Sequence, residues 1–367
     1  MRGLFYSPMG TADANAASGV VRMAALLQRA LREAGVEVAT PALTRTYEGK
    51  GDRAAQQRLR DASMAAADAL LARIRDGVVA KPDFWFSYHV YYKSPDWIGP
   101  AVSRALRIPY LVAEGSHAPK RAGGPWALAH DGTTEALKTA DRLLAMTAFD
   151  RFCLDQIAPG RVRDLKPFID VSTVEERAER PRSQGQTAHL VAVGMMRDER
   201  KRASYRLLAD ALQRISDVPL RLSIAGDGAF RGEIEAMFAR TAHHDVHFLG
   251  AVPAARISQL MASADVFAWP GLGEAYGLVF LEAQGAGVPV VACADRGVPD
   301  ATRAGETALL SAPGDAAAYA ANLRRVLADA PLRERLGRTG REFVQKERSV
   351  EAAAKTLRGV LAELGVA

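Results

Sequence analysis

Short apolar segments alternate with longer amphipathic segments along the chain, and this alternation predicts the order of strands and helices. In the first half, the apolar segments predict strands at 3–8, 36–39, 84–90, 109–113 and 143–146. Amphipathic segments predict helices at 19–34, 56–77, 96–106, 134–140 and 150–157. The second half repeats the pattern, with predicted strands at 189–195, 220–225, 246–249, 266–269 and 288–293 and helices near 203–215, 230–240 and 254–263. Strands that alternate with helices favour parallel sheets with helices on both faces, which is an α/β fold.

A run of charged and polar residues at 175–186, with one proline and one glycine, separates the two halves and is typical of an interdomain linker. A chain of 367 residues is long enough for two domains that each bury a core. We therefore expect an N-terminal Rossmann-like domain at 1–176, a C-terminal Rossmann-like domain at 187–348 and a final helix within 349–367.

Composition narrows the class of protein. The chain is 49% hydrophobic and 25% charged, no apolar run is long enough to cross a membrane, and the apolar N-terminal patch is too short for a signal peptide. Cys153 and Cys293 are far apart and outside any metal-binding spacing, which favours a cytoplasmic, reducing environment. The net charge of +6 suits an anionic ligand such as a nucleoside diphosphate, or a peripheral contact with the inner face of a membrane. Without a nucleic-acid-binding signature or a block of like charges, we expect no nucleic-acid partner.

Candidate chemistry is concentrated in the segment 270–291, PGLGEAYGLVFLEAQGAGVPVV. A loop that contains Glu274 follows a predicted strand, and the helix after it carries Glu282 eight positions later. Loops that leave the carboxyl ends of parallel strands are where such folds bind ligands. The backbone N–H groups at the helix start, from Tyr276, Gly277 and Leu278, would suit a phosphate. The alternative is that Glu274 only caps the helix and that Glu282 is a solvated surface residue.

This segment resembles the E-x7-E motif of retaining glycosyltransferases of family 4, the group 1 type with the GT-B fold. The matching residues are Pro270, Glu274, Gly277, Leu278, Glu282, Ala283, Gly287, Pro289 and Val290. The resemblance covers nearly the whole chain and is sharp at 193–315. It implies two Rossmann-like domains facing across a cleft that holds a nucleotide-sugar donor, with the last helix, at 349–364, crossing back to the first domain.

The resemblance also implies roles for individual residues. Glu282 would accept hydrogen bonds from the ribose hydroxyls, and Glu274 from the hydroxyls of the donor sugar. Gly226 would form a turn beneath the nucleotide, and Arg231, where a dinucleotide fingerprint requires glycine, argues against NAD.

Two further roles fall in the first half of the chain. Gly19 would lie near the donor phosphates or the acceptor, although a tight turn explains a glycine there almost as well. His117 would reach the donor sugar, with His89 as the rival, and a structural role is the alternative for either histidine.

The segment that binds the diphosphate in the family has a different sequence in this chain. The segment 194–202, GMMRDERKR, has methionines where the family has arginine, and one inserted residue. We predict that Lys201 takes the family's lysine role and that Arg197 replaces the missing arginine, because a guanidinium can form two parallel bonds to phosphate oxygens. Arg200 and Arg202 are then expected to be solvated.

The sequence thus predicts a retaining glycosyltransferase that moves a sugar from a nucleotide sugar to an unidentified acceptor. No D-x-D motif is present, so we expect no metal and no other cofactor. The alternatives are a nucleotide-sugar epimerase or a phosphorylase on a similar scaffold, or a non-catalytic module that binds nucleotide sugars.

Overall fold

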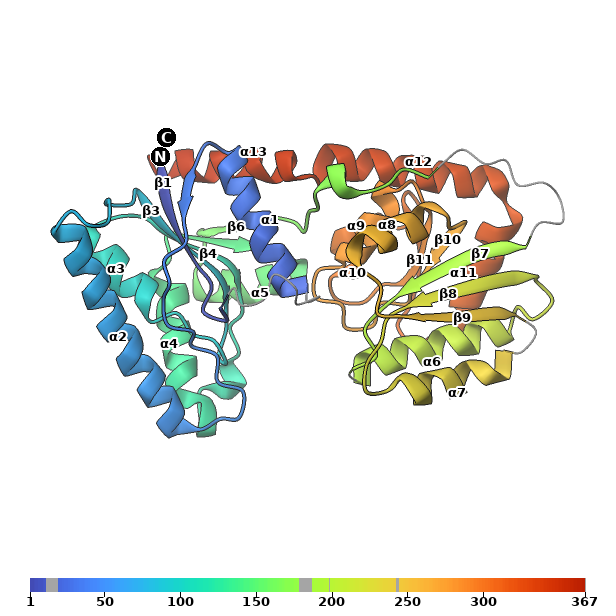
Figure 1. Cartoon of the computed structure of the whole chain (residues 1–367), viewed down its shortest axis with the longest axis horizontal. Coiled ribbons are helices and arrows are strands. Elements are labelled where there is room, and N and C mark those ends of the chain that lie inside the picture. The colour runs from blue at the N-terminus through green and yellow to red at the C-terminus, as the bar shows by residue number, and fades with distance from the viewer. Residues whose placement is uncertain (11–18, 178–186, 198, 242–243, 367) are drawn as a thin grey trace. The chain divides into compact units, whose positions relative to one another are not determined.

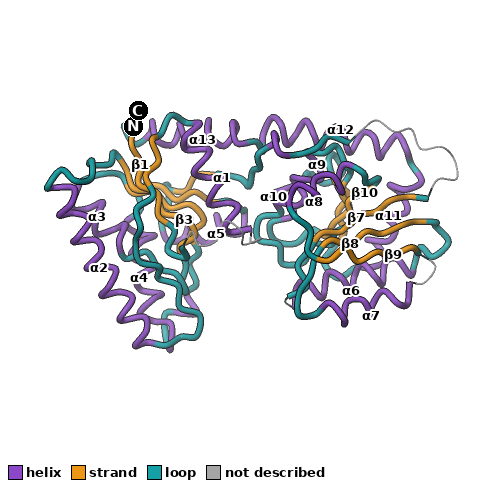
Figure 2. Tube along the Cα trace, in the orientation of Figure 1, coloured by secondary structure: helices purple, strands orange, loops and turns teal. Residues whose placement is uncertain are grey.

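Two six-stranded sheets, all of whose paired strands run parallel, form the framework of the protein. The computed structural model describes residues 1–10, 19–177, 187–197, 199–241 and 244–366. The chain divides into unit 1, Met1–Lys166 with Val350–Ala367, and unit 2, Pro167–Ser349. Each unit contains one sheet, drawn as arrows in Figure 1 and in orange in Figure 2. The expectation of parallel sheets covered by helices is therefore confirmed.

The sheet of unit 1 has the strand order β2-β1-β3-β4-β5-β6. Its strands are β1 (Arg2–Tyr6), β2 (Glu37–Ala39), β3 (Phe84–Val90), β4 (Tyr110–Gly115), β5 (Arg142–Ala145) and β6 (Val162–Asp164). The helices are α1 (Gly19–Glu33), α2 (Arg53–Arg75), α3 (Ile98–Leu106), α4 (Ala127–Thr139), α5 (Ala148–Ile157) and, at the end of the chain, α13 (Val350–Glu363). Helix α13 packs along α1 (Figure 1).

Central strands of this sheet are apolar on both faces because helices cover both of them. Strand β3 has the sequence FWFSYHV, and six of its seven residues are buried. Strand β4 extends two residues further than its apolar run predicted, through Glu114 and Gly115. The space beside Gly115 is filled, since a Cβ atom there would lie 2.4 Å from Leu137 Cδ2. Glycine therefore lets the strand continue against helix α4.

The sheet of unit 2 has the order β12-β11-β10-β7-β8-β9. Its strands are β7 (Ala188–Val193), β8 (Leu220–Ala225), β9 (Asp245–Gly250), β10 (Val266–Ala268), β11 (Val290–Cys293) and β12 (Ala308–Ser311). The helices are α6 (Glu199–Gln213), α7 (Arg231–Phe238), α8 (Ala254–Ala262), α9 (Leu278–Gly285), α10 (Val298–Ala301), α11 (Ala316–Ala328) and α12 (Ala330–Glu347). The helices form two layers on opposite faces of the sheet (Figure 1). One layer contains α6, α7 and α11, and the other contains α8, α9, α10 and α12.

The boundary between the units differs from the one expected from the sequence. Residues 167–176, assigned from the sequence to the N-terminal domain, belong to unit 2. Long-range backbone contacts hold them there: the Ile169 N–H donates to Arg348 O at 2.9 Å, and the Glu175 N–H donates to Ser258 Oγ at 2.6 Å. The linker predicted at 175–186 lies mostly outside the described residues. At the other end, the chain re-enters unit 1 at Val350, next to the boundary expected at 348/349.

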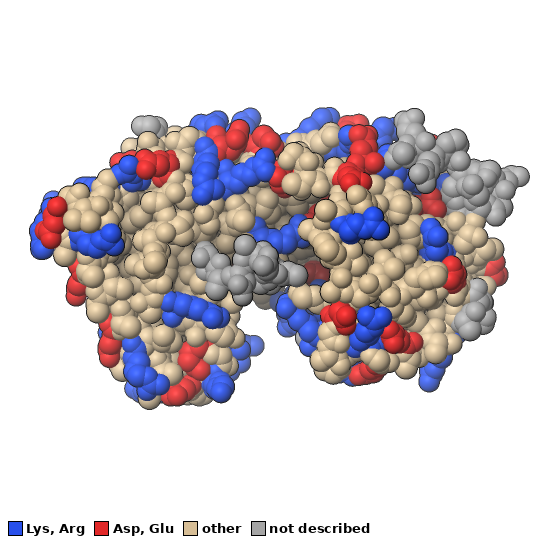
Figure 3. All heavy atoms as spheres, viewed as in Figure 1, with Lys and Arg blue, Asp and Glu red and all other residues tan. Residues whose placement is uncertain are grey.

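The surface has neither a large patch of one charge on the face drawn in Figure 3 nor, among the described residues, a helix that could span a membrane. Basic and acidic side chains alternate over the face drawn in Figure 3, without a large patch of one sign. Among the described residues, no helix combines the length and the apolarity that crossing a membrane requires.

Candidate functional site

The candidate site in unit 2 lies where the order of the strands reverses. Strands β7 and β10 are neighbours, but the chain continues from β7 toward β8 and from β10 toward β11, on opposite sides. The loops that follow two such strands diverge and leave room for a ligand at the carboxyl edge of the sheet. The segment after β7 leads into α6, and the segment after β10 leads into α9, so residues from both meet at this edge.

Glycine at position 277 sets the start of helix α9. Gly277 has φ +71° and ψ 31°, a left-handed conformation in which a side chain is strained. A Cβ atom there would also lie 2.9 Å from Ala301 Cβ. Among the described residues, the N–H groups of Gly277, Leu278 and Val279 have no hydrogen-bond acceptor. The start of α9 therefore presents free donors, as expected for Gly277 and Leu278, whereas Tyr276 is buried and takes part in other contacts.

The carboxylate of Glu274 is held from several sides. The Lys201 ammonium forms an ion pair with Oε1, and the Trp269 indole N–H donates to the same oxygen at 3.2 Å. The side chains of Lys201 and Glu274 are only 16% and 17% exposed. The backbone is fixed as well, because the Gly297 N–H donates to Glu274 O at 3.0 Å. The structure thus brings together two predicted site residues that are 73 positions apart in the sequence.

Aromatic rings behind this ion pair keep it partly shielded from water. Lys201 Nζ lies 5.5 Å from the centre of the Trp269 ring, and Tyr205 meets the same indole edge-on at 4.8 Å. Burial, and after it the negative charge of Glu274, raises the pKa of Tyr205. The Tyr205 hydroxyl donates to Gly194 O at 2.5 Å and so ties α6 to the end of β7.

Sequence reasoning missed three supporting residues of this site: Trp269, Tyr205 and Asp295. The carboxylate of Asp295 accepts a hydrogen bond from the Gly273 N–H at 2.7 Å and fixes the loop next to Glu274. Asp295 comes two positions after the end of β11, at the same edge of the sheet, and that position was the available signal. Trp269 and Tyr205 read as ordinary core residues in the sequence.

The residues of the basic segment after β7 lie in different environments. Met196 is fully buried, and its carbonyl accepts the Phe230 N–H at 3.0 Å, so it anchors the segment. Arg197 is exposed. Arg202, which was expected to be solvated, is half-buried and bound by acids, with Nη2 at 2.5 Å from Glu233 Oε1 and Nη1 at 2.7 Å from Glu199 Oε2. Arg200 is exposed, as expected, but its side chain also lies against Gly273 in the loop that carries Glu274.

Gly226 is required by close packing of backbones. A Cβ atom at this position would lie 1.9 Å from Gly194 O. The Gly226 N–H donates to Gly250 O at 2.8 Å, and the Gly194 N–H donates to Ala225 O at 3.0 Å. The glycine therefore lets the loops after β7, β8 and β9 approach one another beneath the candidate site.

Glu282 lies one helical turn inside α9, on the helix that Gly277 starts. Its side chain is half-buried and takes part in other contacts. Neighbouring residues in the helix, from Phe280 to Gln284, are otherwise buried. Glu274 and Glu282 are thus carried by the loop and the helix of one βαβ unit, as the sequence predicted.

Gly19 and His117, the site residues predicted in the first half of the chain, both belong to unit 1. Gly19 is the first residue of α1, and nothing lies within 4 Å of the position of a Cβ atom, so no steric need for glycine exists there. His117 follows β4, and its ring lies 5.3 Å from that of the buried His130. Burial, then the nearby His130 and Lys138, lower the pKa of His117, so its imidazole is neutral at pH 7.

The rival histidine is part of a different arrangement. His89 Nδ1 contacts the Glu114 carboxylate, which joins the carboxyl ends of β3 and β4. Both residues have positive φ, +66° and +55°, which side-chain-bearing residues rarely adopt. Backbone strain of this kind is held in place by the surrounding structure and is common at functional sites.

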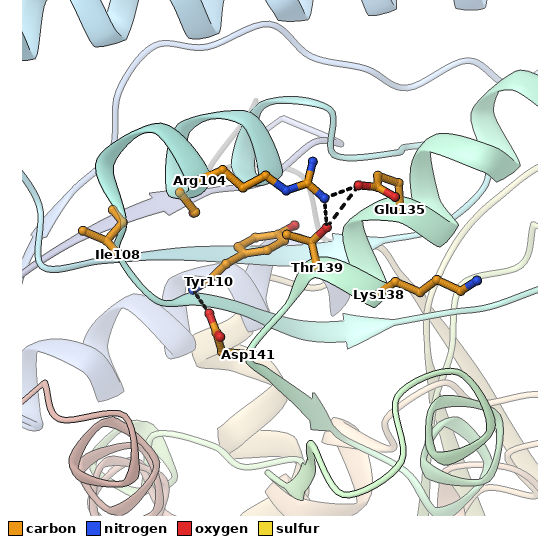
Figure 4. Close-up of a pocket in the computed structure, with 8 residues that line it drawn as sticks. Arg104, Ile108, Tyr110, Glu135, Lys138, Thr139 and Asp141 are labelled. Carbon is orange, nitrogen blue, oxygen red and sulfur yellow. Dashed lines mark hydrogen bonds and ion pairs between the residues drawn. The ribbon is translucent and has the colours of Figure 1, made fainter.

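A separate pocket of about 410 Å³ opens at the other edge of the unit 1 sheet (Figure 4). It lies where β4 and β5 begin, far from the carboxyl ends of the strands. Several of its polar groups bind one another: Arg104 pairs with Glu135, and the Tyr110 N–H donates to the Asp141 carboxylate at 2.8 Å. The Ser103 hydroxyl that lines it has no hydrogen-bond partner, but the pocket lies at the amino ends of β4 and β5 rather than at the carboxyl edge, where such folds bind ligands.

Among the described residues, no group of three or more His, Cys, Asp or Glu side chains is arranged to hold a metal ion. The prediction that no metal is needed stays a prediction, because a nucleotide can supply ligands of its own.

The second half of the chain is similar in sequence to known glycosyltransferases. Residues 187–329 match the family described as "Glycosyl transferases group 1". The chain is 34% identical over 146 residues to sulfoquinovosyl transferase SQD2 of Arabidopsis thaliana, covering 39% of this chain and 28% of that protein. It is 29% identical over 277 residues to the D-inositol 3-phosphate glycosyltransferase of Nocardia farcinica, covering 70% and 59%. The aligned parts thus span less than two thirds of these relatives.

Comparison with solved structures bears on the fold. The crystal structure of Anabaena HepE in complex with UDP aligns with a TM-score of 0.71 over 99% of this chain and 100% of that chain, at 14% identity. At this identity the likeness shows the fold alone, and the fold agrees with the two parallel sheets described above. Residues 187–329 thus resemble the group 1 glycosyl transferases, and the chain has the GT-B fold.

Proposed function

We propose that the protein is a retaining glycosyltransferase that uses a nucleotide-sugar donor bound by unit 2. One observation carries the proposal: the strand-order reversal brings the Lys201–Glu274 pair next to the free N–H groups at the start of α9. A cation, a fixed carboxylate and a helix N-terminus at one sheet edge suit a sugar diphosphate.

The proposed chemistry follows from these groups. Breaking the bond between the sugar and the diphosphate places negative charge on the leaving oxygen. The positive end of helix α9 and a basic side chain, Lys201 or Arg197, would stabilise that charge. Glu274 would accept hydrogen bonds from hydroxyls of the sugar, and Glu282 from hydroxyls of the ribose. The acceptor would attack the face that the leaving group vacates, so configuration is retained without a covalent enzyme intermediate.

The names of similar proteins support this choice over the alternatives. D-inositol 3-phosphate glycosyltransferases and a 2-deoxystreptamine glucosyltransferase are among the relatives, and HepE was crystallised with UDP and with UDP-glucose. None of these names points to an epimerase, a phosphorylase or a non-catalytic module. We propose UDP as the first nucleotide to test, with no metal or other cofactor. A peripheral contact with a membrane at the cytoplasmic face remains part of the proposal.

The test begins with binding and continues with turnover. Titration calorimetry should detect UDP binding to the wild-type protein. Release of UDP from a panel of UDP-hexoses, with and without candidate acceptors, identifies the donor, and NMR coupling constants of the first-formed product give its anomeric configuration. A product of inverted configuration would contradict the retaining mechanism. UDP binding without turnover of any donor would favour the non-catalytic module.

A further inference from the structure

Cations and aromatic rings alternate at the carboxyl edge of the unit 1 sheet. The loops that follow β2, β3 and β4 each bring one cation and at least one aromatic ring to this edge. The cation–ring pairs are Arg45 with Tyr47, Lys93 with Trp126 and Arg121 with Tyr92, at 5.2, 5.5 and 5.2 Å from the ring centres. Three separate loops thus contribute the same two kinds of group.

Ring contacts join these pairs into one assembly. The rings of Tyr91 and Tyr92 lie 5.7 Å apart, and Tyr92 meets Trp126 edge-on at 5.2 Å. The Arg45 side chain is close enough to Tyr91 to act on its ionisation, lowering a pKa that burial raises. We call this assembly the aromatic–cation cluster. It consists of Arg45, Tyr47, Tyr91, Tyr92, Lys93, Arg121 and Trp126.

The cations of the cluster lack acidic partners. Among the described residues, none of the ammonium and guanidinium groups of Arg45, Lys93 and Arg121 forms an ion pair, and Arg121 Nε is buried without a hydrogen-bond partner. The nearby acids are engaged elsewhere. Glu114 pairs with His89, and Glu48 accepts backbone N–H groups, including that of Gly51 at 2.7 Å.

A buried guanidinium nitrogen without a partner costs free energy unless something else binds it. Cations that rest on ring faces keep their N–H groups available for an anion. The aromatic–cation cluster therefore holds excess positive charge, next to flat apolar surfaces.

The position of the cluster in the fold points to a ligand. Strand β1 lies between β2 and β3, so the order of the strands reverses there, and loops at such a point diverge at the carboxyl edge. Gly10, which follows β1, lies at the same edge, since a Cβ atom there would be 3.2 Å from Arg45 Cδ. Unit 1 thus has a strand-order reversal of its own, with the aromatic–cation cluster at its carboxyl edge.

We propose that the aromatic–cation cluster binds the acceptor, and that the acceptor is a sugar or polyol ring that carries a phosphate group. This proposal rests on the glycosyltransferase function proposed above. The exposed parts of Tyr91 and Tyr92 offer ring surface for the apolar side of the acceptor ring. Arg45, Lys93 and Arg121 supply N–H donors for a phosphate dianion, which guanidinium groups bind through parallel hydrogen bonds. The phosphate can belong to a soluble compound or to a lipid headgroup.

The experiment compares ligands that differ only in the phosphate. Calorimetry on the full chain with UDP present measures binding of glucose 6-phosphate against glucose, and of myo-inositol 1-phosphate against myo-inositol. Vesicles containing phosphatidylinositol, against phosphatidylcholine vesicles, test the lipid source. We expect at least one phosphorylated member to bind tenfold or more tightly than its neutral partner.

Variants assign the binding to the cluster. Arg121→Gln and Lys93→Gln should each weaken binding of the phosphorylated member about ten- to a hundredfold and leave the neutral member unchanged, because a hydrogen bond to a charged group is lost. Tyr92→Leu should weaken both members alike. Lys81→Gln is the matched control, because Lys81 is exposed and precedes β3 at the opposite edge of the sheet.

The proposal is overturned if no phosphorylated compound binds more tightly than its neutral partner, or if Lys81→Gln weakens binding as much as Arg121→Gln. UDP binding, measured on the same samples, reports separately on unit 2. If the wild-type protein binds UDP but does not prefer the phosphorylated compounds, only the acceptor proposal is refuted. Phosphate-dependent binding without UDP binding or turnover refutes the glycosyltransferase function instead.

Discussion

Removing the ammonium of Lys201 tests whether its pair with Glu274 serves catalysis or only stability. Lys201→Met keeps the length of the side chain and leaves Glu274 with the Trp269 N–H at 3.2 Å. Since the two side chains are 16% and 17% exposed, losing this charged hydrogen bond should lower the free energy of unfolding by roughly 1.5–3 kcal/mol. For a unit the size of Pro167–Ser349, that corresponds to a fall in Tm of about 3–12 °C.

The effect on the reaction is expected to exceed the effect on stability. If Lys201 stabilises charge on the leaving diphosphate, kcat for release of UDP from the donor should fall about 10²–10³-fold. Arg202→Met is the control, since it removes a cation whose partners, Glu199 and Glu233, are exposed to solvent; it should cost less than about 1 kcal/mol and leave kcat unchanged.

A double variant separates the two roles of Lys201. Lys201→Met combined with Glu274→Gln leaves no unpaired charge at this largely buried position, so the double variant should regain part of the lost stability. Its kcat should stay low, because neither the cation nor the carboxylate is restored. Recovery of activity together with stability would refute the catalytic role, and so would a rate for Lys201→Met equal to that of Arg202→Met.

Four further outcomes are expected. Glu282→Ala should weaken UDP binding by roughly 1.5–3 kcal/mol in calorimetry, and unchanged affinity would remove Glu282 from the ribose. Arg197→Ala should lower kcat about 10²–10³-fold while Arg200→Ala changes it little; the reverse result would assign the diphosphate to Arg200, which lies on Gly273. Activity should persist in excess chelator, and complete loss that Mg²⁺ or Mn²⁺ restores would contradict metal independence. Burial lowers the pKa of His189 below its ordinary 6.5, so the folded state binds fewer protons than the unfolded state at mildly acidic pH. The free energy of unfolding should therefore fall as the pH drops below about 6.5, with a smaller slope in His189→Asn; equal slopes would exclude His189 as the cause.

Local patterns in the sequence were sufficient to predict the elements. Apolar runs of strand length and amphipathic runs of helix length placed most of the strands and helices, because burial of one face imposes a period that a short window of sequence displays. The short strands β6 (Val162–Asp164) and β12 (Ala308–Ser311) were missed, since three or four residues carry too little of such a pattern. The segment with Glu274, Gly277 and Glu282 was also recognisable locally, since its residues are close together in the chain.

Only the tertiary structure decided which loops meet. The order of the strands in each sheet places residues 73 positions apart, Lys201 and Glu274, in contact, and it gathers Arg45, Lys93 and Arg121 around one set of rings. Hydrophobic periodicity does not record which strands become neighbours, because every strand in a covered parallel sheet is apolar in the same way. The environments of the arginines depend on the same packing. Arg202 is bound to acids, whereas Arg197 and Arg200 are exposed and Arg200 lies against Gly273. The sequence alone thus determined the elements and the kind of chemistry, whereas the packing of the sheets determined which side chains share a site.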